Sequence, residues 1–240
     1  MMAVVAFSMA AFFDARRSAR DGEDAKRMAA QFRTLAVMAD PSVISPNWII
    51  RASDSLAGAP LRIVVWQDLL CSDSWFFGDQ LKRLEPFYSG KMNVVFQHFP
   101  LEASCNDVAR KDLHPGACDL AAMALYAPDR FSILYERLFA EQTAAKTPEW
   151  RAALARELGL EAALTDSTAW ARLHEIVRTG AEYEKTHDQY TNGVRSTPTL
   201  LINGRLVIGT FPDHLMRAML DEALVEAEPG HTRFLESWVE

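Results

Sequence analysis

The chain has 240 residues, of which 49% are hydrophobic and 24% charged, so it can bury a sizeable core and is neither disordered nor repetitive in composition. Its formal net charge of −7 argues against nucleic acid as a partner, because phosphate binding requires a basic face. The sequence contains 3 cysteines, so one thiol is left over once a pair has formed, and such a thiol is a candidate reactive site.

The chain begins with a mostly apolar stretch, residues 1–13, which is too short for a usual membrane span. Small residues near its middle resemble a signal-peptide cleavage site, but no basic residue precedes the apolar run. The stretch is therefore compatible with a signal peptide, with a membrane anchor or with a buried helix, and membrane attachment is one expectation. A charged helical segment, residues 14–40, and a turn-rich linker, residues 41–60, follow it.

The stretch from Ile63 to Phe77 predicts a strand, a turn and a helix. Ile63 to Trp66 have the β-branched and aromatic character of a buried strand, whereas apolar residues recur at helical spacing from Trp75 onward. Cys71 then lies where the strand gives way to the helix. A thiol at a helix N-terminus faces unpaired backbone N–H groups and the positive end of the helix dipole, which favour the thiolate. This placement predicts an exposed sulfur nucleophile.

Ser74 occupies the position three residues after Cys71, where a redox motif of the form Cys-x-x-Cys carries its resolving thiol. A serine hydroxyl can donate a hydrogen bond to a thiolate but cannot form a disulfide. We therefore expect Cys71 to be captured by a partner thiol, with no internal residue to release it. Two origins of the motif stay open: a natural Cys-x-x-Ser variant, or a resolving cysteine replaced in order to trap partners.

A second strand, residues 92–99, completes a βαβ unit, which implies parallel strands. Cys71 then lies at the carboxyl end of the first strand, where open α/β sheets bind their ligands. From about residue 101 to 191 helical patterns replace the strand signals and predict a helical insertion. Asn203-Gly204 between two apolar runs predicts a β-hairpin. A final helix is expected to pack its apolar face on the sheet.

This order of elements resembles the DsbA-like branch of the thioredoxin superfamily over roughly Gly58 to Ala227. The motifs that carry the resemblance are Ala59-Pro60, Asp68-Leu69-Leu70-Cys71-Ser72-Asp73-Ser74 and Thr197-Pro198-Thr199. The resemblance implies an α/β thioredoxin fold. The domain limits that it implies are an N-terminal extension and linker over 1–57, a thioredoxin-like domain over 58–228 with its helical insertion at about 101–191, and a tail over 229–240.

The resemblance implies that Cys71 is the nucleophile of a thiol–disulfide oxidoreductase, with Ser74 where the family has its second cysteine. It also implies that Pro198 is cis and that Thr197 and Pro198 form a loop beside the sulfur, with backbone groups free to pair with an extended substrate. The expected partners are protein thiols or disulfides and a redox partner protein. No metal or organic cofactor is expected, and a small thiol such as glutathione would serve as co-substrate.

Cys105 and Cys118 flank a turn-rich segment that can double back. A structural disulfide is the favoured interpretation and would contribute on the order of 3 kcal/mol by chain entropy, while a second redox pair that exchanges with Cys71 or with a partner is the rival. A zinc site that includes His114 lacks a recognised spacing. A disulfide here would favour an oxidising, extracytoplasmic compartment such as the periplasm. The segments Phe99-Pro100-Leu101, Cys105-Asn106 and His114-Pro115-Gly116-Ala117-Cys118 also resemble thioredoxin-like domains found with bacterial vitamin K epoxide reductase homologues.

Four other residues near these motifs have both a structural and a functional interpretation. Asp68 could act as a buried proton acceptor, although a turn hydrogen bond is the commoner fate of an aspartate at a strand end. Trp75 is expected to shield the thiol or to offer a peptide surface, while His98 and His114 are expected to be structural. Two alternatives to thiol exchange stay open: a non-catalytic module that binds extended chains, and a glutathione-dependent thiol transferase.

Overall fold

The computed structural model describes residues 20–44, 46–183, 193–231 and 233. The apolar stretch over residues 1–13 lies outside them, so its assignment as a signal peptide, an anchor or a buried helix stays a prediction. None of the helices in the described part of the chain combines the length and the apolar character that crossing a bilayer requires.

The chain divides into two compact units, of which the larger is Ala36–Thr210. The smaller unit contains a helix over residues 20–34 and α7 (Asp213–Ala227). The small apolar residues that cluster in it are Ala25, Ala29 and Ala218. Arg33 donates a hydrogen bond to the buried carboxylate of Glu222 on α7. The final helix that the sequence predicts is therefore present, and an N-terminal helix is its partner within this unit.

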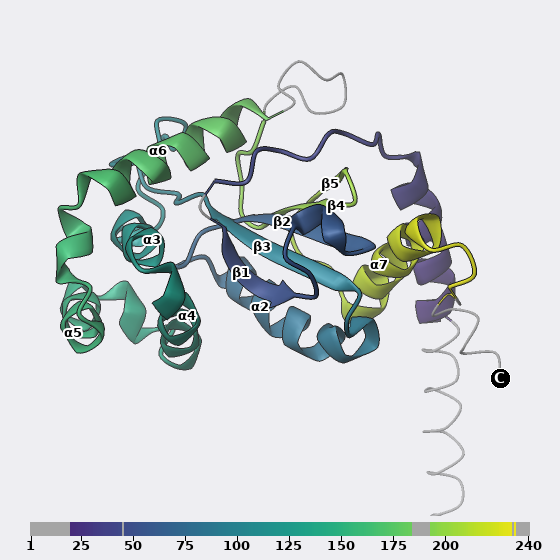
Figure 1. The fold of residues 1–240 in the computed structure, drawn as a ribbon, viewed down its shortest axis with the longest axis horizontal. Helices are drawn as coiled ribbons and strands as arrows, with labels where there is room; N and C mark the ends of the chain where they lie inside the picture. The colour runs from purple at the N-terminus through teal and green to yellow at the C-terminus, as the bar shows by residue number, and fades with distance from the viewer. Residues whose placement is uncertain (1–19, 45, 184–192, 232, 234–240) are drawn as a thin grey trace, which may run out of the picture. The chain divides into compact units, whose positions relative to one another are not determined.

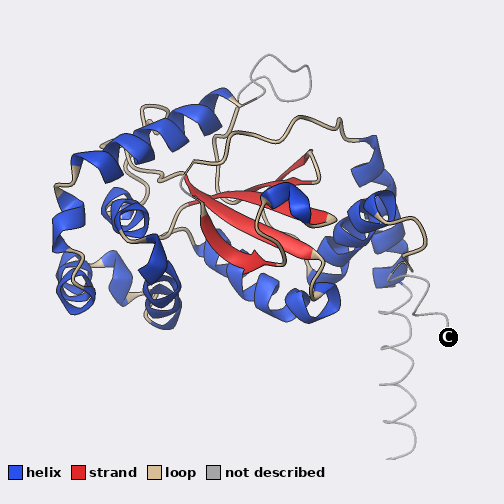
Figure 2. Ribbon diagram, in the orientation of Figure 1, coloured by secondary structure: helices blue, strands red, loops and turns tan. Residues whose placement is uncertain are grey.

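The larger unit is built on a mixed sheet (Figure 2). Its strands in the described residues are β1 (Asn47–Arg51), β2 (Leu61–Gln67), β3 (Met92–His98), β4 (Thr199–Ile202) and β5 (Arg205–Ile208). They lie in the order β1-β3-β2-β4-β5. β2 and β3 are parallel, while β1 runs antiparallel to β3, β4 to β2 and β5 to β4. This order confirms the predicted α/β fold with its βαβ unit and its hairpin.

β1 lies inside the segment for which the sequence predicts a linker, residues 41–60, and that prediction was wrong at this point. Trp48, Ile49 and Ile50 have the aromatic and β-branched character of a strand. Turn residues flank this run on both sides, and a run of five residues gives only a weak periodic signal. Since β1 pairs with β3, the sheet begins before residue 58, where the sequence places the start of the domain.

In the part of the predicted insertion that the structure describes, four α-helices lie between β3 and β4. They are α3 (Ala117–Tyr126), α4 (Phe131–Ala140), α5 (Pro148–Leu158) and α6 (Ser167–Glu182). Short 3-10 helices lie at Leu56–Gly58, Glu85–Tyr88, Pro128–Arg130, Ala144–Lys146 and Glu161–Leu164. Thr147 and Asp166 cap α5 and α6 by accepting hydrogen bonds from backbone N–H groups of the first turn. Figure 1 shows the insertion helices gathered at one end of the sheet.

α6 packs closely on the core of the larger unit. Gly180 makes this approach possible, because a Cβ there would meet the rings of Trp66 and Phe99. Trp66 also packs against Tyr183, with ring centroids 5.1 Å apart. Trp66 lies near the end of β2 and Phe99 directly follows β3. The insertion is therefore fixed to the same edge of the sheet at which the sequence predicts the functional site.

The hairpin between β4 and β5 has the turn that its sequence predicts. Asn203 and Gly204 both have positive φ, 45° and 85°, as a two-residue hairpin of this hand requires. The side chain of Asn203 accepts a hydrogen bond from the Arg62 N–H and donates one to the Pro60 carbonyl oxygen. These bonds tie the turn to the start of β2 and hold β4 in register beside it.

Candidate functional site

Three segments of the chain meet at one edge of the sheet. Gln67 and His98 are partners at the ends of the parallel strands β2 and β3. Trp66 is the partner of Thr199, the first residue of the antiparallel strand β4. The residues that follow Gln67 and His98 and those that precede Thr199 therefore converge, which brings together Cys71, the loop after β3 and Pro198.

Cys71 is the N-cap residue of α2 (Ser72–Leu84), as the strand–turn–helix pattern predicts. Its backbone is extended, with φ −76° and ψ 125°, and its carbonyl oxygen accepts the Trp75 N–H at 3.1 Å. The Cys71 side chain makes no capping hydrogen bond, so the first-turn N–H groups of α2 keep their positive field beside the sulfur. Of the chain's three cysteines, all within the described residues, Cys71 is the free one.

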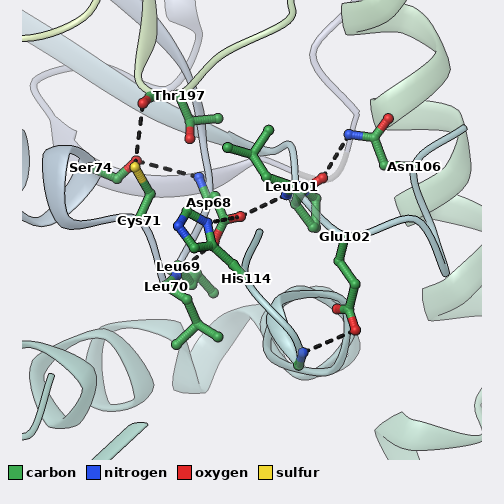
Figure 3. A network of polar contacts seen from close by, with 12 residues as sticks. Asp68, Leu69, Leu70, Cys71, Ser74, Leu101, Glu102, Asn106, His114 and Thr197 are labelled. Atoms are coloured by element: carbon green, nitrogen blue, oxygen red, sulfur yellow. Dashed lines mark hydrogen bonds and ion pairs between the residues drawn. The ribbon is translucent and has the colours of Figure 1, made fainter. Parts of the chain in front are cut away.

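The sulfur of Cys71 lies 3.4 Å from the carbonyl oxygen of Thr197, to which the thiol donates (Figure 3). The peptide bond between Thr197 and Pro198 is cis. A carbonyl oxygen accepts a hydrogen bond only from the protonated thiol, whereas the N-terminus of α2 favours the thiolate. The two surroundings of the sulfur thus favour opposite protonation states.

Cys71 is 7% exposed, so the prediction of an exposed sulfur was wrong in degree. The Thr197 loop lies against the sulfur, and the preceding turn residues Leu69 and Leu70 are buried. Trp75 is buried as well, and its indole N–H donates to the Leu69 carbonyl oxygen at 2.7 Å. These neighbours leave little of the Cys71 sulfur accessible to the sulfur of a partner.

Ser74 lies one helical turn after Cys71 and is 2% exposed. Its Oγ accepts a hydrogen bond from the Asp68 N–H at 3.4 Å and so joins the first turn of α2 to the end of β2. Within the described residues, no hydrogen bond joins Ser74 Oγ to the sulfur. Donation from Ser74 to a Cys71 thiolate stays a prediction about the ionised state.

Asp68 is a buried carboxylate beside this turn, with 0% exposure. Its Oδ1 accepts the Leu70 N–H at 2.7 Å, which is the turn hydrogen bond expected for an aspartate at a strand end. Its Oδ2 accepts the Leu101 N–H at 2.7 Å and lies 2.8 Å from His114 Nδ1 (Figure 3). Sequence reasoning missed the contacts with Leu101 and His114. The signal available for the Leu101 contact is that Asp68 and Leu101 follow neighbouring parallel strands.

Cys105 and Cys118 form a disulfide that closes the loop after β3, with their Cα atoms 6.0 Å apart. Glu102, on the same loop, caps α3 by accepting the N–H groups of Gly116 and Cys118 at 3.0 and 2.8 Å. Because the disulfide contains both sulfurs, a zinc site with His114 is not formed. Across the described residues, no three histidine, cysteine, aspartate or glutamate side chains are grouped in a way that could hold a metal ion.

A Cys105→Ala/Cys118→Ala double variant is expected to lose about 3 kcal/mol of unfolding free energy, because removal of the crosslink raises the conformational entropy of the unfolded chain. The bridged residues are 13 apart in sequence. Urea unfolding without reductant measures the loss. Cys71→Ala removes a sulfur outside the bridge and is the matched control. Equal losses in the two variants would contradict the assignment of a stabilising role to the disulfide.

His98 lies at the end of β3, but its hydrogen-bond partner is Asn47 and not Asp68. It is buried, its Nε2 lies 2.7 Å from Asn47 Oδ1, and its ring packs edge-on against Phe131. Burial lowers the pKa of His98 to about 3. These contacts confirm the packing role that the sequence predicts for His98.

Comparison with known protein families matches residues 62–221 to the DSBA-like thioredoxin domain, a stretch that holds β2, α2, β3, the insertion and the hairpin. The chain belongs to this DsbA-like family. No curated protein sequence matches the DsbA-like chain.

Solved structures share the fold of this DsbA-like chain at low sequence identity. A variant of ScsC from Proteus mirabilis is 14% identical, with a TM-score of 0.58 over 93% of both chains. Oxidised BdbD from Bacillus subtilis is 18% identical, with a TM-score of 0.57 over 80% of this chain and 99% of its own. A periplasmic thioredoxin-like protein from Salmonella enterica serovar Typhimurium is 16% identical, with a TM-score of 0.50 over 70% and 86%. At these identities the likeness concerns the fold, and the closer resemblance to domains associated with vitamin K epoxide reductase homologues stays a prediction.

Proposed function

We propose that this DsbA-like chain exchanges thiols and disulfides with protein substrates through Cys71 as its single nucleophile. The observation that carries the proposal is a free cysteine at the N-terminus of α2, with its sulfur 3.4 Å from the backbone of the cis-proline loop. A helix N-terminus stabilises a thiolate, which is the nucleophile in disulfide exchange. Membership of the DsbA-like family supports the same chemistry.

The exchange begins when the Cys71 thiol loses its proton and gives up its hydrogen bond to Thr197. The thiolate attacks one sulfur of a substrate disulfide, a bond forms between Cys71 and that sulfur, and the other substrate sulfur leaves as a thiolate that is protonated by solvent. Ser74 has no sulfur with which to break the new bond. A thiolate from glutathione or from a redox partner protein attacks the substrate sulfur of the mixed disulfide. A new disulfide forms between that thiol and the substrate, and Cys71 leaves as a thiolate, so the number of disulfide bonds is unchanged.

The Thr197–Pro198 loop is the proposed binding surface for an extended substrate. Once Cys71 ionises, the Thr197 carbonyl oxygen no longer receives the thiol proton and can accept an N–H from the substrate backbone. This backbone oxygen supports main-chain recognition by strand addition, which suits substrates of varied sequence.

An oxidising, extracytoplasmic location completes the proposal. The disulfide between Cys105 and Cys118 supports it, because such bonds persist outside the reducing cytosol. The relative from Salmonella is itself described as periplasmic. The proposal holds for either origin of Ser74, a natural residue or a replacement that traps partners.

Mixing the protein with a peptide that contains a disulfide is expected to give a covalent adduct on Cys71 that accumulates, because Ser74 cannot resolve it. Mass spectrometry without reductant measures the adduct, and peptide mapping assigns its position. Added glutathione is expected to dissolve it. The control is Cys71→Ala, which keeps the Cys105–Cys118 bridge and is expected to form no adduct.

Three outcomes would contradict the exchange proposal. Wild-type protein that forms no adduct would show that Cys71 is inert towards disulfides. Cys71→Ala that binds unfolded chains as tightly as wild type, with no adduct in either protein, would favour the non-catalytic binding module. Conjugation of glutathione to a small electrophile, with no exchange on peptides, would favour a thiol transferase.

A further inference from the structure

His114 connects a buried carboxylate to solvent. Asp68 is fully buried, whereas the side chain of His114 is 23% exposed, and the two meet at 2.8 Å (Figure 3). A buried carboxylate is costly unless it is paired and hydrogen-bonded. The N–H groups of Leu70 and Leu101 supply hydrogen bonds, and His114 is the ionisable partner.

The hydrogen bond between the two side chains defines which ring nitrogen carries hydrogen. An ionised carboxylate can only accept, so Nδ1 of His114 is the donor and Nε2 is the basic nitrogen. When a proton from water binds Nε2, the Nδ1 proton can pass to Asp68 Oδ2. Asp68 is then neutral, and His114 is again neutral with its hydrogen on Nε2. The reverse sequence returns the proton to water.

The loop after β3 holds His114 at this position. The carbonyl oxygen of Leu101 accepts the His114 N–H at 3.3 Å, while the N–H of Leu101 donates to Asp68. The His114 carbonyl oxygen accepts the Ala117 N–H at 3.0 Å, at the start of α3. Upstream, the buried side chain of Asn106 donates to the Pro100 carbonyl oxygen at 2.6 Å. The ring is therefore fixed through its own backbone at both ends.

Asp68 belongs to the same turn as the sulfur. Its carbonyl oxygen accepts the Cys71 N–H at 3.1 Å, and its N–H donates to Ser74 Oγ. A buried negative charge close to a thiol disfavours the thiolate, whereas a neutral carboxyl group or a carboxylate paired with an imidazolium does so less. Asp68 is therefore placed to act on Cys71 through the turn that they share, and His114 to act on Asp68.

We propose that His114 is a positioning residue for Cys71. It holds the Asp68 carboxylate in place, exchanges its proton with solvent and so determines the pH range in which the sulfur reacts. This inference rests on the proposed function, because it assigns His114 a role in the reaction of Cys71. It goes beyond the structural role that the sequence predicts for His114.

Other charged groups lie on the segments that carry the pair and on the helices of the insertion, and the test has to hold them constant. They are Asp73 of α2, Glu102 and Asp112 of the loop, Asp119 of α3, Lys146 of the 3-10 helix before α5, and Arg151 of α5. Burial, followed by the charge of Glu102, raises the pKa of Asp119. Arg151 donates to the carbonyl oxygens of Ala145 and Lys146. Single substitutions at His114 or Asp68 leave all of these residues in place.

The test is the pH dependence of Cys71 alkylation by iodoacetamide, with the Cys105–Cys118 bridge intact so that one thiol reacts. Wild type is expected to show two inflections, one from the thiol and one from the pair, because coupled ionisations titrate in separate steps. In His114→Gln the side chain still donates to Asp68 but has no ionisable nitrogen. We expect the ratio of the variant's alkylation rate to that of wild type to change about threefold across the pH range, because the variant has no ring that takes up a proton beside Asp68.

Two matched variants complete the test. Asp68→Asn is expected to lose the inflection of the pair, and His174→Gln, on the exposed face of α6, is expected to reproduce the wild-type profile. A His114→Gln profile that superimposes on wild type, or that differs by the same factor at every pH, would overturn the proposal. The second result is what a purely structural role gives. Failure of the proposed function looks different, because no mixed disulfide would then form on Cys71 at any pH.

A measurement on the wild-type ring keeps the proposal testable if the variants fail to fold. Coupling between two ionisable groups is reciprocal, so His114 must sense the charge on Cys71. The ring-proton NMR signal of His114 is therefore expected to titrate differently in wild type and in Cys71→Ser. Titration curves that coincide would overturn the inference.

Discussion

A Ser74→Cys variant is expected to release a captured partner without external thiol. Release should be on the order of a hundredfold faster than wild type achieves with millimolar glutathione, because an internal thiol acts at a far higher effective concentration. The substituted position lies one helical turn after Cys71, where a resolving thiol can attack the mixed disulfide. The time course of adduct loss, followed by mass spectrometry without reductant, measures the effect.

The matched control for this variant is Ser74→Ala. Ser74 is buried and accepts a hydrogen bond from the Asp68 N–H, so either substitution is expected to cost about 1 kcal/mol of stability through the weakened or lost bond. Only the cysteine variant gains a resolving group. Mixed disulfides that persist equally long in the two variants would contradict the interpretation of Ser74 as the missing resolver.

The fold could be predicted from the sequence where its signals are local. A pattern of only a few residues predicts the strand from Ile63 to Trp66 and the turn at Asn203-Gly204, and both are in the structure. β1 could not be predicted in this way. Its five residues form a strand because β3 is available to pair with them, about 45 residues further along the chain, and a local pattern does not contain that partner.

In the candidate site too, some features could be predicted from the sequence and others depend on distant contacts. The position of Cys71 at a strand end follows from the strand–turn–helix pattern. Its proximity to Pro198 is what the resemblance to the DsbA-like family implies, and the structure contains it. The contact between Asp68 and His114 depends on how the disulfide-closed loop folds back across 46 residues of sequence. The burial of the sulfur depends on Thr197, which is 126 residues away. Contacts of this kind depend on side-chain packing, which no periodic pattern encodes.

His98 gives the protein a second pH-dependent property, its stability towards acid. The ring is buried, and its Nε2 donates to Asn47 Oδ1, which faces the ring because Asn47 Nδ2 donates to the Ala124 carbonyl oxygen. In the described residues Nδ1 of His98 is buried without a partner. Burial lowers the pKa of His98 from 6.5 to about 3, because a charged imidazolium would lose its hydration there.

The free energy of unfolding is expected to fall by about 1.4 kcal/mol per pH unit through His98 as the pH drops from 6.5 towards 3. In this window the unfolded chain binds a proton at His98 and the folded chain does not. Above pH 6.5 the ring is neutral in both states and its full contribution to stability is present. Below pH 3 both states are protonated and the loss levels off.

The variant His98→Gln keeps a donor for Asn47 and removes the titrating ring. Between pH 6.5 and about 5, where ordinary carboxyl groups scarcely titrate, wild type is expected to lose about 2 kcal/mol more than the variant by urea unfolding. His174→Gln is the control and should follow wild type. Parallel curves for wild type and His98→Gln would contradict the buried, neutral ring.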